Sequence, residues 1–146
     1  MKPPLRKSRS IFFIVTAFAL LLIVIGGASV AAAYNYPMQG SMSWSFVKGN
    51  NPNQSYFSIT ISVSAKSAAV TPSQVNVAFS SSYNGSIYFL HSCALYRISG
   101  QTYTSCSFNT PFKGGGEYVF AATFTDTTGK LVAITIIDPH AEPEWK

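Results

Sequence analysis

A run of uncharged, mostly apolar residues at positions 11–33 constrains this chain more than any other feature. As a helix it spans a bilayer, because ~20 residues rising ~1.5 Å each cover the ~30 Å hydrocarbon core. The leader at positions 1–10 has no acidic residue and carries the cations Lys2, Arg6, Lys7 and Arg9. By the positive-inside rule this end stays in the cytoplasm. We therefore expect a cytoplasmic leader over residues 1–10, an apolar helix over residues 11–33 and an exported domain after it.

Two interpretations of the apolar run follow from its residues. A secretory signal peptide needs a small-residue cleavage site, and Ala31-Ala32-Ala33 offers one, with the cut between Ala33 and Tyr34. Alternatively the helix remains as an anchor, with Tyr34, Tyr36 and Trp44 placed for the headgroup layer, where amphipathic aromatic side chains gather. The first interpretation predicts a released domain and the second a tethered one.

A third interpretation comes from a resemblance. Arg9-Ser10 followed by Ile11-Phe12-Phe13-Ile14-Val15-Thr16-Ala17 resembles the prepilin-type leader of archaeal type IV pilins. The resemblance implies processing between Ser10 and Ile11, and a retained apolar helix that packs in the core of a filament. Val15 stands where bacterial pilins typically carry an acidic residue, so the similarity is to the archaeal pattern. The three interpretations place the mature N-terminus at different residues.

The charge balance argues against a nucleic-acid partner. The chain has 146 residues, ten Lys and Arg, five Asp and Glu, and a formal charge of +5. Four of the cations belong to the leader, so the exported part is close to neutral. It has no Lys/Arg-rich stripe to follow a phosphate backbone. Its abundance of Ser, Thr, Asn, Tyr and Phe favours a β-rich domain that faces the outside of a cell.

Strict alternation of apolar and polar residues predicts several β-strands. The pattern is clearest where apolar residues alternate with Ser and Thr, at Phe57, Ile59, Ile61 and Val63. Such a period of two gives a strand with one buried and one wet face. The same pattern recurs at Met42, Trp44 and Phe46, and at Val75, Val77 and Phe79. We therefore predict an all-β fold over residues 34–138, a β-sandwich of about seven strands.

Two turn signals place hairpins in this domain. Asn84-Gly85 is the strongest, because a type I′ turn needs two residues that tolerate positive φ. It joins a predicted strand over residues 75–83 to one over residues 86–91. Asp126-Thr127-Thr128-Gly129 links predicted strands over residues 117–125 and 130–137. The segment over residues 139–146 contains two prolines and no alternation, so we predict a tail that leaves the last strand.

A second resemblance narrows the class of the predicted sandwich. Gly116-Glu117-Tyr118-Val119-Phe120 resembles the tyrosine corner of immunoglobulin-like domains, in which a Tyr precedes a buried position of the penultimate strand by two residues. Phe120 stands where an antibody domain has Cys, so the resemblance implies a related fold without the usual bridge between the sheets. It implies that the sandwich is an immunoglobulin-like β-sandwich of about seven strands, and it leaves the function open.

Cys93 and Cys106 are the two cysteines of the chain, and in an exported domain we predict that they form a disulfide. If Ser99-Gly100 is a two-residue turn, the two cysteines fall at a non-hydrogen-bonded pair with Cα atoms ~4.5 Å apart, which a disulfide tolerates. A bulge in the turn changes this register. The alternative is a metal site built from the same cysteines with His91 and His140.

Other motifs do not support catalysis. Gly114-Gly115-Gly116 lacks the Gly-Lys-Ser/Thr ending of a phosphate-binding loop, and there is no Gly-x-Ser-x-Gly elbow. The acidic residues are too few for a general acid/base pair. Asn53-Gln54-Ser55 and Asn84-Gly85-Ser86 match the N-glycosylation pattern, with Asn53 the more plausible acceptor because the turn alone explains Asn84. We expect no enzyme activity, cofactor or catalytic residue.

These features lead to one functional prediction and one alternative. The prediction is a cell-surface structural subunit of the pilin type, which assembles through its apolar helix into a homo-oligomeric filament and exposes its β-sandwich outside the cell membrane. The alternative is a secreted or membrane-anchored immunoglobulin-like module that binds or adheres to another protein of the cell envelope. Both contain the same helix and sandwich, so the mature N-terminus is the feature that separates them.

Overall fold

The computed structural model describes residues 35–139, which form eight β-strands and one short 3-10 turn. In chain order the elements are β1 (Met38–Val47), η1 (Pro52–Gln54), β2 (Tyr56–Ala65), β3 (Gln74–Tyr83), β4 (Ser86–Ser99), β5 (Thr102–Tyr103), β6 (Cys106–Pro111), β7 (Tyr118–Thr125) and β8 (Leu131–Ile137). The predicted leader and apolar helix, and all of the predicted tail except Pro139, lie outside the described residues. The prediction of a mainly β domain is confirmed.

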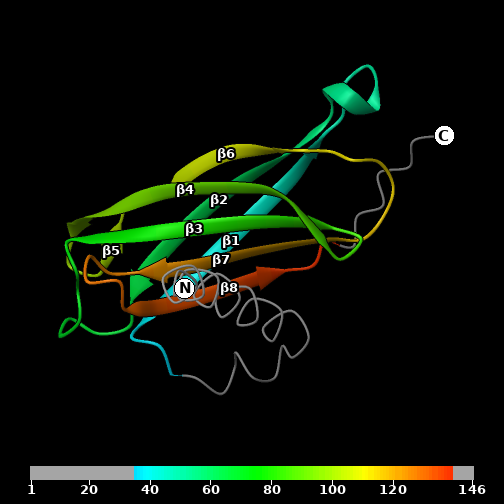
Figure 1. The fold of residues 1–146 in the computed structure, drawn as a ribbon. Coiled ribbons are helices and arrows are strands. Elements are labelled where there is room, and N and C mark those ends of the chain that lie inside the picture. Colours follow the sequence, from blue (N-terminus) through cyan, green and yellow to red (C-terminus); the bar gives the residue numbers. More distant parts are fainter. Residues whose placement is uncertain (1–34, 140–146) are drawn as a thin grey trace, which may run out of the picture. The chain divides into compact units, whose positions relative to one another are not determined.

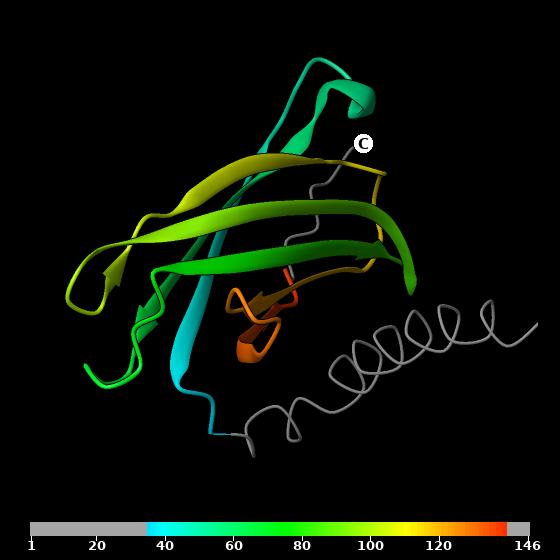
Figure 2. The same ribbon diagram turned by 60° about the vertical axis from the view of Figure 1, so that its left-hand side comes forward.

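The strands pair antiparallel in the order β1-β2-β5-β4-β3-β7-β8, and β6 pairs with β2 beside this path. Strands β1, β2 and β6 form one layer, and β4, β3, β7 and β8 form the other (Figures 1 and 2). The two-residue β5 pairs with both β2 and β4 and so connects the layers. Because β1 and β8 also lie against each other, the sheet nearly closes into a barrel.

Alternation along β2 builds one wall of the core. Phe57, Ile59 and Ile61 are fully buried, while the serines and threonine between them point outward, as the sequence predicts. On β1, Met38 and Met42 are buried, but Trp44 and Phe46 are only partly so. Trp44 and Phe46 are less buried than the apolar residues of β2 because β1 is at an end of the hydrogen-bonded order, whereas β2 is paired on both sides.

Aromatic rings fill the centre of the core. Phe57 on β2 lies 4.8 Å from Tyr118 and 5.2 Å from Phe120, measured between ring centroids, and both contacts are edge-to-face. Phe79 on β3 lies 5.9 Å from Phe120. Edge-to-face geometry matches the positive edge of one ring to the negative face of the next. These contacts join the two layers, because Phe57 belongs to one layer and Phe120 to the other.

Gly40 explains how β1 approaches the second layer. The ring of Phe124 on β7 lies directly over Gly40, and an added Cβ there would stand 2.8 Å from the Cζ atom of that ring. The absence of a side chain therefore allows β1 to pack closely against β7 and β8, where the barrel-like sheet closes.

We expect Gly40→Ala to lower the free energy of unfolding by about 1–3 kcal/mol, because the buried Phe124 ring must move to accept the methyl group. Denaturant titration followed by circular dichroism measures the change. Gly115→Ala is the matched control, since a Cβ at Gly115 would meet nothing within 4 Å. Equal stability of the two variants would contradict the close packing at Gly40.

The predicted type I′ turn is confirmed. Asn84 and Gly85 both have positive φ, at 49° and 83°, and they join β3 to β4. The pairing of β3 with β4 has one irregularity, because its register shifts between Ser81 and Ser82. Ser81 beside this irregularity is fully buried, and its hydroxyl has no hydrogen-bond partner among the described residues.

Asp126 organises the turn between β7 and β8. One carboxylate oxygen of Asp126 accepts hydrogen bonds from the Thr128 hydroxyl at 2.6 Å, the Thr128 amide at 2.9 Å and the Lys130 amide at 3.0 Å. Gly129 completes the turn with a φ of 86°. The Thr128 hydroxyl bond is the largest influence that lowers the pKa of Asp126 below 3.8. Hydrogen bonds to the ionised form stabilise that form.

This arrangement predicts a pH-dependent contribution to stability. Because the folded pKa of Asp126 is lowered, its contribution is present above the unfolded pKa and is lost as the pH falls through the folded value. We expect Asp126→Ala to lower the melting temperature at pH 7, with a smaller difference from wild type below about pH 4. Thr127→Ala, an exposed change in the same turn, is the control. A difference in melting temperature between Asp126→Ala and wild type that did not change with pH would contradict the prediction.

Tyr118 at the start of β7 is almost completely buried, with 1 % of its surface exposed. Its hydroxyl donates to the Gly114 carbonyl oxygen at 2.6 Å and accepts from the Lys113 amide at 2.8 Å. The side chain therefore fixes the backbone of the loop that precedes its own strand. Burial raises the pKa of Tyr118 to about 12, against the weaker opposing influence of these hydrogen bonds.

We expect Tyr118→Phe to lower the free energy of unfolding by about 1–3 kcal/mol, because the Lys113 amide and Gly114 carbonyl lose a buried partner. A raised folded pKa means that the ionisable hydroxyl stabilises the fold below pH 10 and less above it. The difference between variant and wild type should thus shrink in alkali. Urea titrations at pH 7 and at high pH measure it, and Tyr96→Phe, at a half-exposed ring, is the control. If the difference in unfolding free energy between Tyr118→Phe and wild type were the same at both pH values, ionisation of the Tyr118 hydroxyl would not affect stability.

Candidate functional site

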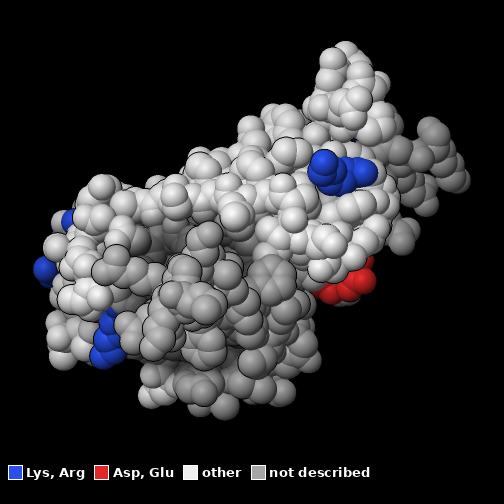
Figure 3. All heavy atoms as spheres, in the orientation of Figure 1, with Lys and Arg blue, Asp and Glu red and all other residues white. Residues whose placement is uncertain are grey.

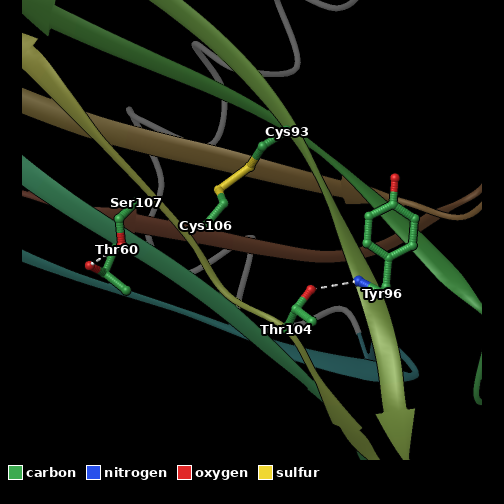
Figure 4. The surroundings of a disulfide bond; sticks show 6 residues. All are labelled: Thr60, Cys93, Tyr96, Thr104, Cys106 and Ser107. Carbon is green, nitrogen blue, oxygen red and sulfur yellow. Dashed lines mark hydrogen bonds between the residues drawn. A yellow bond between two sulfur atoms is a disulfide. The ribbon is translucent and has the colours of Figure 1, made fainter.

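The disulfide lies where the two layers meet. Cys93 on β4 and Cys106 on β6 are bonded, 13 positions apart in the sequence and with Cα atoms 6.6 Å apart (Figure 4). Strand β4 pairs with β3 in one layer, and β6 pairs with β2 in the other. The disulfide is therefore a covalent link between the layers, formed by the pair of cysteines that the sequence predicts.

The predicted register of the two cysteines is wrong. In the structure Ser99 lies opposite Thr102 and Arg97 opposite Tyr103, with an irregularity between the two pairs. The Thr104 amide still donates to the Tyr96 carbonyl oxygen at 2.8 Å, and the Thr104 hydroxyl accepts from the Tyr96 amide at 2.8 Å (Figure 4). Beyond Thr104 the chain leaves β4 to pair with β2. The cysteines are thus not a ladder pair, because the bulge and the change of layer separate their strands.

Side chains, rather than ladder hydrogen bonds, close the seam between β4 and β6. Measured between ring centroids, the Phe108 ring on β6 lies 4.7 Å from Phe79 and 4.2 Å from His91. It is stacked on the imidazole of His91 with an angle of 29° between the ring planes. At the far end the Tyr88 hydroxyl donates to the Pro111 carbonyl oxygen at 2.7 Å. Together with the disulfide these contacts define the seam. The seam could not be predicted from the sequence, because no local pattern shows which strand β6 pairs with.

The alternative metal site is not formed by the described residues. Cys93 and Cys106 are bonded to each other, and the His91 ring is stacked on Phe108. Within residues 35–139 no group of three His, Cys, Asp or Glu side chains could hold a metal ion. His140 lies outside the described residues.

The two sequons have different surroundings. Asn53 is exposed in η1, at the tip of the hairpin between β1 and β2 (Figure 1). Its partner Ser55 is only 3 % exposed, and the Ser55 hydroxyl accepts from the Gly49 amide at 2.9 Å and donates to the Asn51 carbonyl oxygen. The hydroxyl that completes this sequon is therefore engaged within the folded turn.

At the second sequon the arrangement is more open. Asn84 and Ser86 are both exposed, and the Asn84 side-chain oxygen accepts from the Glu117 amide at 3.0 Å. An N-linked sugar attaches to the amide nitrogen, so this contact would remain after modification. The geometry favours Asn84 over Asn53 as an acceptor in the folded domain, the reverse of the order that the sequence suggests. Both sites remain predictions.

The predicted processing residues Ser10, Ile11, Ala33 and Tyr34 lie outside the described residues. In residues 35–139 no helix has the length and apolar character needed to cross a membrane.

The outer surface of one layer is an array of small polar side chains, which we call the hydroxyl face. Its residues point outward from β1, β2 and β6: Ser41, Ser43, Ser45, Ser58, Thr60, Ser62, Ser107 and Asn109. Neighbouring hydroxyls bond across the strands. Ser41 lies 2.6 Å from Ser62, and Thr60 lies 2.9 Å from Ser107 (Figure 4).

A second surface lies on β4, and we call it the β4 strip. It consists of the outward-pointing residues Leu90, Ser92, Ala94, Tyr96 and Ile98. Leu90 is 70 % exposed, Tyr96 53 % and Ile98 64 %, although Leu95 between them points inward and is fully buried. These three are among the most exposed large apolar side chains of the described domain.

Charged residues are scarce on both surfaces. Of those within residues 35–139, only Arg97 belongs to a strand, and its guanidinium donates to the Gly100 carbonyl oxygen at 2.7 Å. The remainder occupy turns and the positions next to strand ends: Lys48, Lys66, Lys113, Glu117, Asp126, Lys130 and Asp138. In Figure 3 the described charges accordingly lie toward the two ends of the strands. Apart from the exposed Arg97 on β4, the strands of the described domain therefore carry no charged residue.

Comparison with known proteins adds no family to this description: neither a protein-family model nor a curated protein matches the chain.

Proposed function

We propose that this chain is a cell-surface structural subunit of the archaeal type IV pilin type. Residues 11–33 form the assembly helix and the β domain is the outward-facing part. An apolar helix of this length has no water-stable monomeric state, so it leaves a membrane only where the same surface is buried against identical helices. The scarcity of charge on the strands of the β domain, where Arg97 is the one charged residue described, carries the proposal, because close lateral packing of identical domains would otherwise bring like charges together.

We further propose that the domain is an immunoglobulin-like sandwich. In that fold strands A, B and E share one sheet, and C, F and G share the other, with C′ added beside C in variable-type domains. The layer β1-β2-β6 corresponds to A, B and E, and the order β4-β3-β7-β8 corresponds to C′, C, F and G. The Tyr118 hydroxyl bonds to Gly114 and Lys113 at the start of the F-like strand, as in a tyrosine corner.

One contact between the layers differs from that of antibody domains. The contact between Phe57 and Phe120, at 5.2 Å between ring centroids, occupies the place between strands B and F where antibody domains have a disulfide. The covalent link between layers is instead Cys93–Cys106, at the seam. An intact disulfide also supports an extracellular location, since cytoplasmic thiols are normally kept reduced.

The proposal is tested by the mature N-terminus of the full-length chain. Co-expression with an archaeal prepilin peptidase, and without it as the control, is followed by intact mass measurement and terminal peptide mapping. Electron microscopy of the sheared surface fraction shows whether filaments form. Processing at Ile11 that depends on the peptidase, together with filaments that contain the chain, is the expected result.

Two other results would overturn the proposal. A mature start at Tyr34 removes the helix and leaves a secreted domain. An unprocessed chain that remains in the membrane without filaments leaves the alternative, an anchored module that binds another protein of the envelope.

A further inference from the structure

The end of the β domain at which the chain enters β1 differs in composition from the opposite end, and we call it the entry end. Met38, the first residue of β1, lies opposite Ala65, the last residue of β2. Tyr96, near the end of β4, lies opposite Gln74, the first residue of β3. The turn between β7 and β8 lies at the same end, because the last residue of β7 pairs near the start of β3. The exposed residues that define the entry end are Lys66, Val70, Tyr96, Arg97, Ile98 and Lys130.

Hydrogen bonds hold the loop between β2 and β3, which carries Val70, against the rest of the entry end. The Arg97 amide on β4 donates to the Ser73 carbonyl oxygen at 3.0 Å. The Tyr103 hydroxyl on β5 donates to the Pro72 carbonyl oxygen at 2.6 Å. Three successive strands, β3, β4 and β5, are thus joined to this loop, and its exposed side chains belong to one surface.

Charge is unevenly divided between the two ends of the domain. Within residues 35–139 the entry end carries the cations Lys66, Arg97 and Lys130. Its one described carboxylate, that of Asp126, accepts three hydrogen bonds from its own turn. The described part of the opposite end carries two cations and two carboxylates: Lys48, Lys113, Glu117 and Asp138. In the view of Figure 3 the left-hand end, where Figure 1 shows β5, has blue atoms, whereas the red atoms lie toward the right. The entry end is the positive end of the domain.

Exposed apolar side chains accompany these cations. Three of the five large apolar side chains that are exposed in the described domain belong to the entry end: Val70, Tyr96 and Ile98. Cations together with exposed aliphatic and aromatic side chains are the composition of surfaces that bind anionic membranes, since the cations attract the headgroups and the apolar groups enter the layer below them. Tyrosine in particular gathers at the headgroup level.

The tether makes a membrane the nearest partner of the entry end. Four residues, 34–37, separate the apolar run from β1, and this segment reaches less than ~20 Å even when it is fully extended. We infer that the entry end docks on the anionic headgroup layer of the membrane that holds residues 11–33. The inference rests on the proposed function, in which residues 11–33 remain in a membrane until assembly. Docking turns the opposite end, with η1 and the Asn84-Gly85 turn, away from the lipid.

Lipid crosslinking from the full-length chain tests the inference. A photo-crosslinking residue replaces Val70, and the chain is reconstituted in vesicles of phosphatidylcholine, with or without an equal amount of phosphatidylglycerol. Val47 is the matched control position, because it is a valine of similar exposure, 36 % against 42 %, at the opposite end. With phosphatidylglycerol present we expect about fivefold or more lipid adducts from position 70 than from position 47, and fewer at high salt, which screens the attraction.

Lysine substitutions separate the contribution of charge. Lys66→Gln with Lys130→Gln removes two cations from the entry end, and Lys48→Gln with Lys113→Gln removes two from the opposite end as the matched control. We expect the first pair to reduce the lipid adducts from position 70 about threefold or more, because each cation near an anionic surface adds to binding. The control pair should leave the adducts unchanged, and circular dichroism should show an intact β domain in every variant.

The failures of the inference and of the proposed function are distinguishable. Equal adduct yields from the two valine positions, or yields that do not depend on phosphatidylglycerol, would overturn the inference and leave the proposed function standing. A full-length chain that does not float with the vesicles after alkaline extraction would show that residues 11–33 do not hold it in a membrane, and this result would refute both.

Discussion

Phe57→Ala is expected to lower the free energy of unfolding by about 3–5 kcal/mol, because it removes the ring on which the aromatic core converges. Phe57 is fully buried and contacts five rings, with centroid distances from 4.8 to 6.0 Å: Trp44, Phe46, Phe112, Tyr118 and Phe120. Truncation of Phe57 to Ala would leave a cavity. The rings around this cavity come from strands of both layers and from the loop before β7, so no single element can move to fill it.

Denaturant titration at pH 7, followed by tryptophan fluorescence and circular dichroism, measures this loss. The expected loss is a large part of the ~5–15 kcal/mol free energy of unfolding of an ordinary domain. Phe46→Ala is the control, because the same atoms are removed from a ring that is only partly buried. We expect it to cost clearly less. If the two variants lost equal stability, Phe57 would not be the centre of the core.

Replacing both cysteines, Cys93→Ala with Cys106→Ala, is expected to cost about 3 kcal/mol in the chain-entropy model for a loop of this size. The disulfide closes the segment of 13 positions that contains the turn and β5. It also links β4 to β6, which share no ladder hydrogen bonds. Its loss therefore weakens the seam between the layers as well as enlarging the unfolded ensemble.

Reductant provides an internal control for this variant. Wild type treated with reductant should lose the same stability as the double variant, whereas the double variant should not respond to reductant at all. Thermal unfolding in the presence and absence of dithiothreitol measures both. A double variant as stable as the oxidised protein would show that side-chain contacts such as Phe108 with His91 close the seam without the disulfide.

Local features of the domain could be predicted because their causes lie within a few residues. The burial of Phe57, Ile59 and Ile61 follows from alternation along one strand, since side chains of an extended chain point to opposite sides in turn. The hairpin at Asn84-Gly85 follows from the tolerance of these two residues for positive φ.

The seam, the hydroxyl face and the β4 strip depend on which strands become neighbours. The alternation in β4 shows that Leu90 and Tyr96 share a face, but not that this face remains uncovered by another strand. The pairing of Thr60 with Ser107 joins positions 47 residues apart. Such contacts are determined by the balance of packing over the whole core, and no short pattern contains them.

The disulfide shows both contributions in one feature. The presence of two cysteines in a chain with a predicted export signal was sufficient to predict their bond, because the expected compartment and the number of cysteines favour it. Their geometry was decided by the tertiary structure. The chain changes layers after Thr104, because β6 hydrogen-bonds to β2 and the Phe108 ring fills the space beside Phe79. The sequence alone determined the strands, the turns and the bonded pair, whereas the free energy of non-local packing decided the layers and the surfaces that they expose.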